Sequence, residues 1–168
     1  MLGVLNDKQI DALLHSQVSG RIGCHAENRT YVVPVTYVYD ADRIICHTRE
    51  GLKLQMMRKN PEVCFEVDNM QNMANWQSVI LWGTFEELKG KEAKEAMEKL
   101  IDRMKPFMTS ETAHPLEPVE SHERRETSGF TAVVYQIKIK EKTGRVEKRY
   151  HSGKSCHITT LEDIKKGF

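Results

Sequence analysis

The sequence predicts a mainly β protein, a small antiparallel barrel with flanking helices, and three observations lead to this prediction. Stretches with alternating apolar residues follow one another, separated by short turn signals, as in antiparallel sheets. Long helical patterns occur only near the N-terminus and after residue 88, which argues against an alternating parallel α/β sheet. Pro34 stands within a strand pattern and cannot donate to a ladder, so that strand must be bulged or lie at an open edge.

Each element follows from a local pattern in the first half of the chain. Asn6 is a helix cap, and the helix after it places Ile10, Leu13 and Leu14 on one face. The period then changes to two, and Val63, Phe65 and Val67 alternate toward a core. Strands are expected at 18–26, 31–39, 43–47, 62–68 and 76–88, with turns at 27–29 and 40–42.

The second half of the chain is more polar. A helix is expected over 89–104, because its apolar residues recur at intervals of three and four, and Pro106 ends it. Residues 109–129 carry two prolines and few apolar side chains, so they are expected to form a mobile loop that could act as a lid. A strand is expected over 130–141, and residues 145–168 are assigned to a polar C-terminal tail.

Composition limits the classes of protein. A chain of 168 residues with 39% hydrophobic content can bury one core, so a single domain over 1–168 is expected. The net charge of +1 predicts no general attraction to nucleic acid or to an anionic membrane, so an anion site must be local. The sequence has neither a secretory signal nor the roughly 20 apolar residues of a membrane span, which predicts a cytoplasmic protein.

The stretch HTREGLKLQMMRKNP, residues 47–61, follows directly on a buried strand pattern. Alternation places His47 on the face opposite Cys46, and Gly51 is expected to permit a tight turn into a short helix. The free N–H groups of that helix, the Thr48 hydroxyl and the Lys53 ammonium would form an anion site suited to a phosphate. A capped turn with a solvated lysine is the alternative, since the pattern has no unique mechanism.

Four ordered blocks carry a resemblance to a known family. They are GRIG at 20–23, YVVPVTYVYD at 31–40, IICHTREGLKLQMMRKNPEVCFEVD at 44–68 and WQSVILWGTFEEL at 76–88. The chain resembles the FMN-binding split-barrel superfamily, also called pyridoxamine 5′-phosphate oxidase-like, and within it the branch associated with nitroimidazole resistance. The resemblance implies a six-stranded antiparallel split β-barrel of the FMN-binding type, and a homodimer with FMN between the two barrels.

The resemblance also implies roles for individual residues. Residues 34–37 would lie against the isoalloxazine ring, His47 and Thr48 would approach the ribityl and phosphate side, and Lys53 would supply charge to the phosphate. Arg21 would reach the phosphate or the ring edge. The residues implied at the cofactor are Arg21, Pro34, Val35, Thr36, Tyr37, His47, Thr48, Gly51, Lys53, Trp76, Ser78 and Val79.

The function implied is that of an FMN-dependent oxidoreductase, which passes electrons from a reduced nicotinamide or another donor to a small organic acceptor such as a nitroimidazole. The alternative is a module that stores or delivers flavin or haem without turnover. A bound flavin carries the redox chemistry itself, so no catalytic residue is assigned, although His47 could assist a proton transfer. The sequence has no Ser-His-Asp order, no Walker loop and no HExxH motif.

Three further patterns have competing interpretations. Cys-His occurs three times, but neighbours on a strand point to opposite faces, so no metal-ligand set is assigned and haem stays the alternative cofactor. Trp76, Ser78, Ile80 and Trp82 share one strand face, which is either a ligand-binding wall or, for Trp82, core or dimer interface. The basic stretch 138–154 could attract the phosphate of a nucleotide such as NADPH or form a solvated strand edge.

Overall fold

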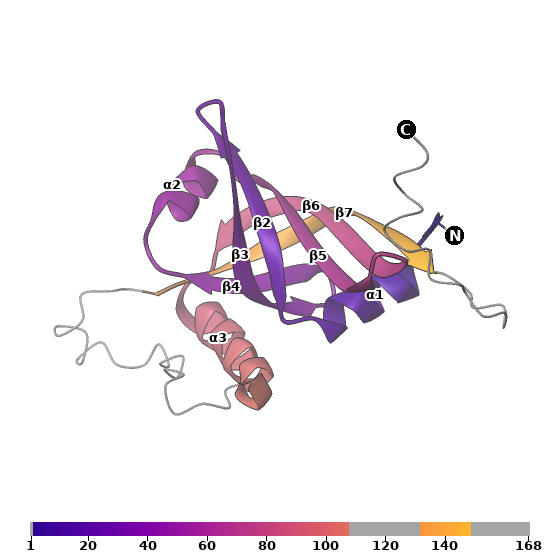
Figure 1. Ribbon diagram of the computed structural model, residues 1–168. Helices are drawn as coiled ribbons and strands as arrows, with labels where there is room; N and C mark the ends of the chain where they lie inside the picture. Colours follow the sequence, from indigo (N-terminus) through magenta and orange to yellow (C-terminus); the bar gives the residue numbers. More distant parts are fainter. Residues whose placement is uncertain (1, 108–131, 149–168) are drawn as a thin grey trace, which may run out of the picture.

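The computed structural model describes residues 2–107 and 132–148, which form seven strands and three helices followed by one short 3-10 turn (Figure 1). The expected loop at 109–129 and residues 149–168 of the expected tail lie outside the described residues. The helices are α1 (Asp7–Ser16), α2 (Leu52–Lys59) and α3 (Gly90–Met104), with the 3-10 turn at Lys105–Phe107. The strands are β1 (Leu2–Val4), β2 (Ser19–Ala26), β3 (Arg29–Asp40), β4 (Arg43–Thr48), β5 (Glu62–Asn72), β6 (Asn75–Glu87) and β7 (Val133–Lys148).

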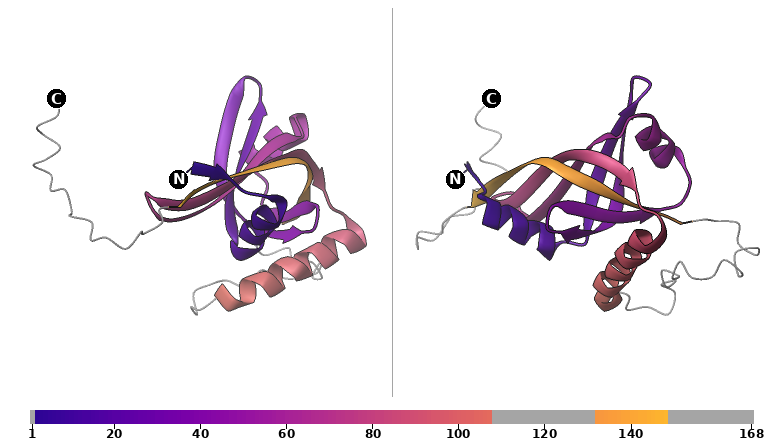
Figure 2. Two further views of the ribbon diagram at one scale, coloured as in Figure 1. Left: turned by 90° about the vertical axis from the view of Figure 1, so that its right-hand side faces the viewer. Right: turned by 180° about the vertical axis from the view of Figure 1, so that it is seen from behind.

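Strands β2 to β7 close into a ring of antiparallel pairs. The order is β7-β4-β3-β2-β5-β6, and β6 then pairs with β7 along almost its whole length, from Asn75↔Lys148 to Glu87↔Tyr135. The short β1 lies outside this ring and pairs with the far half of β7. Figure 2, seen from behind, shows β6 and β7 crossing the molecule side by side. The predicted six-stranded antiparallel barrel is therefore confirmed, with β1 as an added edge strand.

The barrel is split between β3 and β4. These strands pair only from Tyr37↔Cys46 to Asp40↔Arg43, whereas β4 pairs with β7 over its whole length. Among the described residues, the first part of β3 therefore has a strand partner on one side only, where Pro34 pairs with Arg21 of β2. This confirms the open edge that the proline predicted, since a residue without an N–H fits where no ladder runs.

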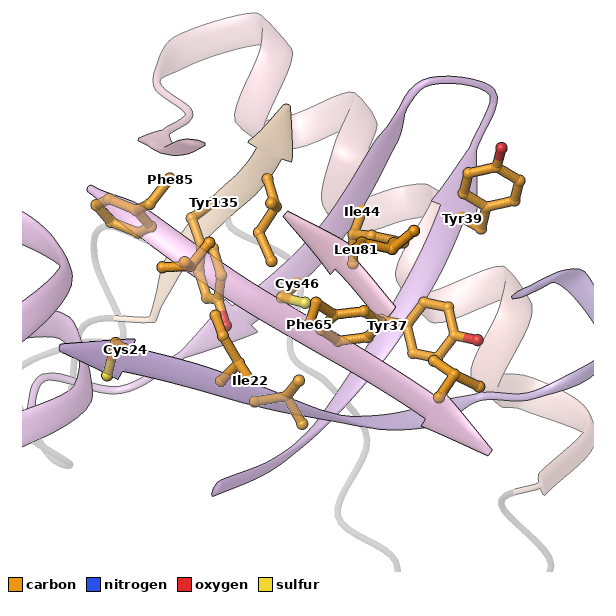
Figure 3. Close-up of a cluster of buried hydrophobic side chains, with 14 of the residues drawn as sticks. Ile22, Cys24, Tyr37, Tyr39, Ile44, Cys46, Phe65, Leu81, Phe85 and Tyr135 are labelled. Atoms are coloured by element: carbon orange, nitrogen blue, oxygen red, sulfur yellow. The ribbon is translucent and has the colours of Figure 1, made fainter. Parts of the chain in front are cut away.

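The core fills the barrel interior with the alternating residues that the sequence indicated. Figure 3 shows Tyr37 beside Phe65, whose rings meet edge to face with centroids 5.0 Å apart. Helix α1 covers one flank with its buried face, and its Asn6 cap exchanges hydrogen bonds with Gln9 in a capping box. Helix α3 packs on the outside of the barrel in a second cluster that includes Ile45 and Val134.

The expectation that the polar tail begins at residue 145 is wrong, because β7 continues to Lys148. The backbone of this half bonds to β6, and Gly144 lies so close to Leu5 that a Cβ on it would stand 2.8 Å from the Leu5 Cβ. Its side chains are mostly polar because they face solvent, and Val146 alone packs against the core from this end. Backbone pairing therefore extends the strand where side-chain hydrophobicity gives little signal.

Two of the open interpretations are decided by exposure and pairing. The Trp82 side chain is 41% exposed on the outer face, so the interpretation of Trp82 as barrel core is wrong, and an interface role stays a prediction. Three described lysines of the basic stretch are held by carboxylates, with Lys138 on Glu86, Lys140 on Glu62 and Lys142 on Asp11 at 2.7 Å each. This part of the stretch carries its own counter-ions, and it is not a strand edge, because Lys138 pairs with Arg43 on one side and Thr84 on the other. None of the helices in the described ranges is long and apolar enough to cross a membrane.

Candidate functional site

The turn between β4 and α2 brings the predicted anion-binding residues to one end of the barrel. His47 and Thr48 are the last residues of β4 and pair with Val134 and Val133 of β7. The chain then leaves the sheet, and α2 begins at Leu52 and packs against β2 at this end of the barrel (Figure 1). Helix α2 buries Leu54, Met56 and Met57, and this packing fixes the direction of its first turn.

Lys53 is a half-buried cation near two thiols. Burial lowers the pKa of its amine below the ordinary value, and the nearby Cys46 and Cys24 thiols oppose this shift only in part. Within residues 2–107 and 132–148, no carboxylate forms an ion pair with the Lys53 ammonium. A desolvated ammonium without a counter-ion costs free energy that a bound anion would recover.

His47 presents a second polar group without a partner. Its Nδ1 atom is buried and has no hydrogen-bond partner among the described residues. Burial lowers the pKa of the imidazole, and the positive charges of Lys53 and Arg49 lower it further. The ring is therefore neutral at pH 7, with one nitrogen as donor and the other as acceptor. A buried polar atom without a partner indicates that a ligand or a water belongs beside it.

Gly51 and Thr48 complete the turn. The Thr48 hydroxyl donates to the Arg49 carbonyl oxygen at 3.0 Å, which leaves its own oxygen free to accept. Gly51 directly precedes α2, as predicted, and its φ of 168° is extended backbone that any residue adopts, so the turn does not depend on the conformational freedom of a glycine. A Cβ on Gly51 would meet nothing within 4 Å. The glycine instead leaves open space directly before the first N–H groups of α2.

These groups fit the phosphate end of a flavin nucleotide. The eight-residue helix α2 offers free backbone N–H groups and no side chain caps its first turn, while Lys53 supplies the positive charge. The open edge of β3 begins next to this turn, because the β3–β4 ladder ends at Tyr37↔Cys46. The backbone at Pro34 and Thr36 lies on this edge and could meet the polar edge of a planar ring. No group of three or more His, Cys, Asp or Glu side chains in the described ranges could hold a metal ion.

The other predicted residues do not join this turn within one chain. The side chains of Val35, Tyr37 and Val79 are buried in the core, and the Tyr37 hydroxyl donates to the Leu14 carbonyl oxygen at 2.8 Å. Only the backbone of these three residues could contact a cofactor. Arg21 lies on the outer face, where Glu66 at 3.0 Å and Asp68 at 2.5 Å neutralise it.

Trp76 and Ser78 lie at the opposite end of the barrel. Thr48 pairs with Val133 at the start of β7, whereas Trp76 pairs with Glu147 near its end. The Trp76 indole donates to the Glu147 carboxylate at 3.1 Å, and the Ser78 hydroxyl donates to Glu66 at 3.4 Å. The residues that the resemblance implied are therefore not all brought together in a single chain, since Lys53 lies at the β4–α2 turn and Trp76 near the far end of β7.

Sequence reasoning missed two features of the site. Cys24 and Cys46 come from different strands and reach Lys53 only in the folded barrel. Arg58, at the other end of α2, donates to Glu50 in the β4–α2 turn. The signal for this ion pair was its spacing in the sequence: Glu50 and Arg58 lie at opposite ends of the same short helix.

A groove lies on the outer face of the barrel, away from the β4–α2 turn. Its volume is about 600 Å³, and its wall is mostly apolar, with Val32, Val63 and Trp82 beside Cys64. Arg21, Glu62 and Glu66 line its margin, and each of them is already in an ion pair. Val32 is 59% exposed, so this face offers an apolar surface with no cover from the described residues of the same chain.

Comparison with known proteins identifies similar folds. A FAD-binding protein from Mesorhizobium loti matches 89% of this chain and 98% of its own, with 22% identity and a TM-score of 0.68. A candidate 5-nitroimidazole antibiotic resistance protein from Bacteroides thetaiotaomicron matches 87% of each chain, with 18% identity and a TM-score of 0.65. A FAD- and haem-binding protein from Mycobacterium smegmatis matches 99% of this chain and 80% of its own, with 14% identity and a TM-score of 0.64.

Sequence comparison gives the family. An uncharacterized protein of Rhizobium meliloti (strain 1021) is 27% identical over 85 residues, which are 51% of this chain and 56% of that protein. The chain thus spans about half the length of this curated relative. The family model for pyridoxamine 5′-phosphate oxidase matches residues 6–146, which include strands β2 to β6 in full and β7 as far as Val146. This protein therefore belongs to the pyridoxamine 5′-phosphate oxidase family.

Proposed function

We propose that this protein binds FMN, with the phosphate at the β4–α2 turn, and that it is an oxidoreductase. The observation that carries the proposal is the half-buried Lys53 ammonium, which has no ion-pair partner in the described parts of the chain and lies near the unpaired His47 Nδ1. A charge in this state favours an anionic ligand. Membership of the family and the flavin-binding proteins among the similar folds support the choice of a flavin.

The residues of the chain have separate tasks in this proposal. Lys53 and the first N–H groups of α2 hold the phosphate, and the backbone of β3 at Pro34 and Thr36 orients the ring. When bound, FMN supplies hydride or single-electron transfer between a donor and an acceptor. His47 is neutral at pH 7, so it can take up or give a proton at a ring nitrogen near the cofactor. The donor proposed is a reduced nicotinamide, and the acceptor is a small organic molecule such as a nitroimidazole.

A homodimer is part of the proposal, because one chain does not assemble all of the expected residues. Trp76 and Ser78 are separated from Lys53 by most of the length of β7. A second copy could bring its own Trp76 face to the β4–α2 turn. The apolar outer groove with Val32 and Trp82 is a surface that such a copy could cover. A cytoplasmic location fits this reading, since reduced nicotinamide donors are cytoplasmic metabolites.

The first test is the visible spectrum of the purified protein and the identity of the chromophore released on denaturation. Flavin bands with release of FMN are expected. The Lys53→Met variant should bind FMN about 10- to 100-fold more weakly, the size of a lost charge-assisted hydrogen bond. The matched control is Lys59→Met on the same helix, whose ammonium is exposed and paired with Glu27, and it should bind normally. A Soret band would favour haem, and a colourless protein that takes up no FMN would overturn the proposal.

A second test separates an enzyme from a carrier. The FMN-loaded protein is mixed anaerobically with NADH or NADPH, and the flavin absorbance is followed. Bleaching by a donor, and recovery on addition of a nitroimidazole, are expected for the oxidoreductase. A flavin that stays oxidised with both donors would leave the alternative, a module that stores or delivers the cofactor.

A further inference from the structure

Arg58 joins the β4–α2 turn to the end of β6. This residue lies in the last turn of α2, and its Nη1 atom donates to both carboxylate oxygens of Glu50, at 2.8 and 2.9 Å. Its Nε atom donates to a carboxylate oxygen of Glu87 at 2.5 Å. One planar guanidinium thus bridges two acidic residues that are far apart in the sequence, a task that suits arginine better than lysine.

The two carboxylates occupy different structural contexts. Glu50 directly precedes Gly51, the residue before α2, and it therefore belongs to the proposed phosphate site. Glu87 is the last residue of β6, and the next residue, Leu88, donates its N–H to the Val134 carbonyl oxygen at 2.9 Å. The Arg58 bridge fastens an exposed turn to the end of a rigid ladder.

The bridge also changes the charge that a ligand meets. Glu50 is the acidic residue nearest in sequence to the free N–H groups of α2, and its carboxylate would repel a phosphate there. Arg58 draws that carboxylate toward the far end of the helix and neutralises it. The hydrogen bonds that Arg58 donates to Glu87 and Glu50 raise the pKa of its guanidinium above the ordinary value, so it stays charged at every physiological pH.

We propose that Arg58 is a positioning residue for the phosphate of the bound nucleotide, acting through Glu50. It fixes the β4–α2 turn in the shape that exposes the α2 N–H groups, and it keeps the Glu50 carboxylate away from the ligand. This inference rests on the proposed function, since it concerns the same FMN site. It predicts an effect that depends on the phosphate rather than on the flavin ring.

The test compares FMN with riboflavin, which has the same ring and no phosphate. Apo-protein is titrated with each ligand, and fluorescence quenching gives the dissociation constants for the wild type, for Arg58→Met, for Arg58→Lys and for the double variant that carries Arg58→Met and Glu50→Gln. Arg58→Met should weaken FMN binding about three- to fivefold, the effect of an exposed ion pair, and leave riboflavin binding unchanged. The affinity of Arg58→Lys for FMN should lie between the affinities of Arg58→Met and the wild type. The Glu50→Gln change in the Arg58→Met background should recover most of the loss, because the repelling charge is gone.

The outcomes separate this inference from the proposed function. A wild-type protein that fails to bind FMN would overturn the proposed function. If the wild type binds FMN and Arg58→Met binds it equally well, the positioning role is overturned while the function stands. An equal loss for FMN and riboflavin would also overturn it, since a general weakening of the fold would act on both ligands. Lys59→Met, the neighbouring residue on α2, is the control for removal of a surface cation.

Discussion

The barrel has a closed side, where β6 pairs with β7, and an open side, where β3 and β4 separate. The two sides differ in how many of their polar groups have partners. On the closed side, β6 and β7 pair along almost their whole length, and lysines such as Lys138 meet carboxylates. On the open side, β3 and β4 separate after Tyr37↔Cys46, the His47 Nδ1 atom has no partner, and Lys53 has no counter-ion in the described ranges. The Tyr135 hydroxyl of β7 is also buried without a partner among the described residues, so the two sides differ in their charged groups: the lysines named on the closed side are paired, whereas Lys53 on the open side is available to a ligand.

Two glycines show the same difference. A Cβ on Gly83, in β6, would clash with the Lys138 carbonyl oxygen and stand 2.7 Å from the Ile137 side chain. A Cβ on Gly51 would meet nothing within 4 Å. The protein itself excludes a side chain at Gly83, whereas only a ligand could exclude one at Gly51. A glycine without any neighbour is therefore the more informative of the two about function.

The largest expected effect is on the closed side. Gly83→Ala should lower the free energy of unfolding by about 2–3 kcal/mol, because the added methyl group forces β6 and β7 apart. Urea unfolding measures this loss. Gly23→Ala is the matched control, since a Cβ there would make only ordinary contacts of 3.7 to 3.8 Å with Cys64 and Val32. Equal stability of Gly83→Ala and the wild type would show that β6 and β7 are not tightly packed at Gly83.

The same change on the open side should affect binding and not folding. Gly51→Ala should unfold within about 0.5 kcal/mol of the wild type, because its backbone is extended and its Cβ would meet no atom. Its affinity for FMN should fall about tenfold, or about 1.4 kcal/mol, since the methyl group would occupy the approach to α2. Titration of the apo-protein measures this. Unchanged FMN affinity would place the phosphate elsewhere.

Removal of the unpaired cation should stabilise the ligand-free fold. Lys53→Met should raise the free energy of unfolding of the apo-protein by about 0.5–1 kcal/mol, because a half-buried charge is replaced by an apolar chain. Lys138→Met on the closed side removes an exposed ion pair and should lower it by at most about 0.5 kcal/mol. Chemical denaturation of both apo-variants shows whether each change raises or lowers the free energy of unfolding. Destabilisation by Lys53→Met would contradict the contrast between the sides.

The smallest expected effect is the contribution of His47 to the pH dependence of the free energy of unfolding. Its pKa in the folded protein lies below the unfolded value, so the unfolded chain takes up the proton first as pH falls. The stability from the neutral ring is complete above the unfolded pKa of about 6.5 and is lost as pH falls toward the folded pKa. Between about pH 8 and 5, the wild type should lose about 0.5 kcal/mol more than His47→Gln. If the wild type and His47→Gln lose the same stability as pH falls, the His47 imidazole is solvated.

The sequence predicted the parts of the fold in which one face is buried. Alternation at Val63, Phe65 and Val67 identified β5, and the stripe that includes Ala93 and Leu100 identified α3. The second half of β7 was missed because its ladder partners are backbone groups of β6 and β1, and backbone pairing leaves no trace in residue type.

The site was predictable as a set of residue types, but their surroundings were not. Arg21 and Lys53 are both cations beside strand patterns, and the family resemblance implied the same ligand for both. Arg21 is neutralised by Glu66 and Asp68, which lie more than 40 positions along the chain. No local pattern shows such a partner. The difference between an occupied and an available cation is a property of the folded chain.

The open edge of β3 has a consequence for the life of the protein before it meets its ligand. A free strand edge invites another chain to add a strand, which is the first step of many aggregation pathways. Pro34 interrupts this edge, because it has no N–H for an incoming strand. Pro34 should therefore limit edge-to-edge association of newly made chains, and replacing it should increase the insoluble fraction of the expressed protein.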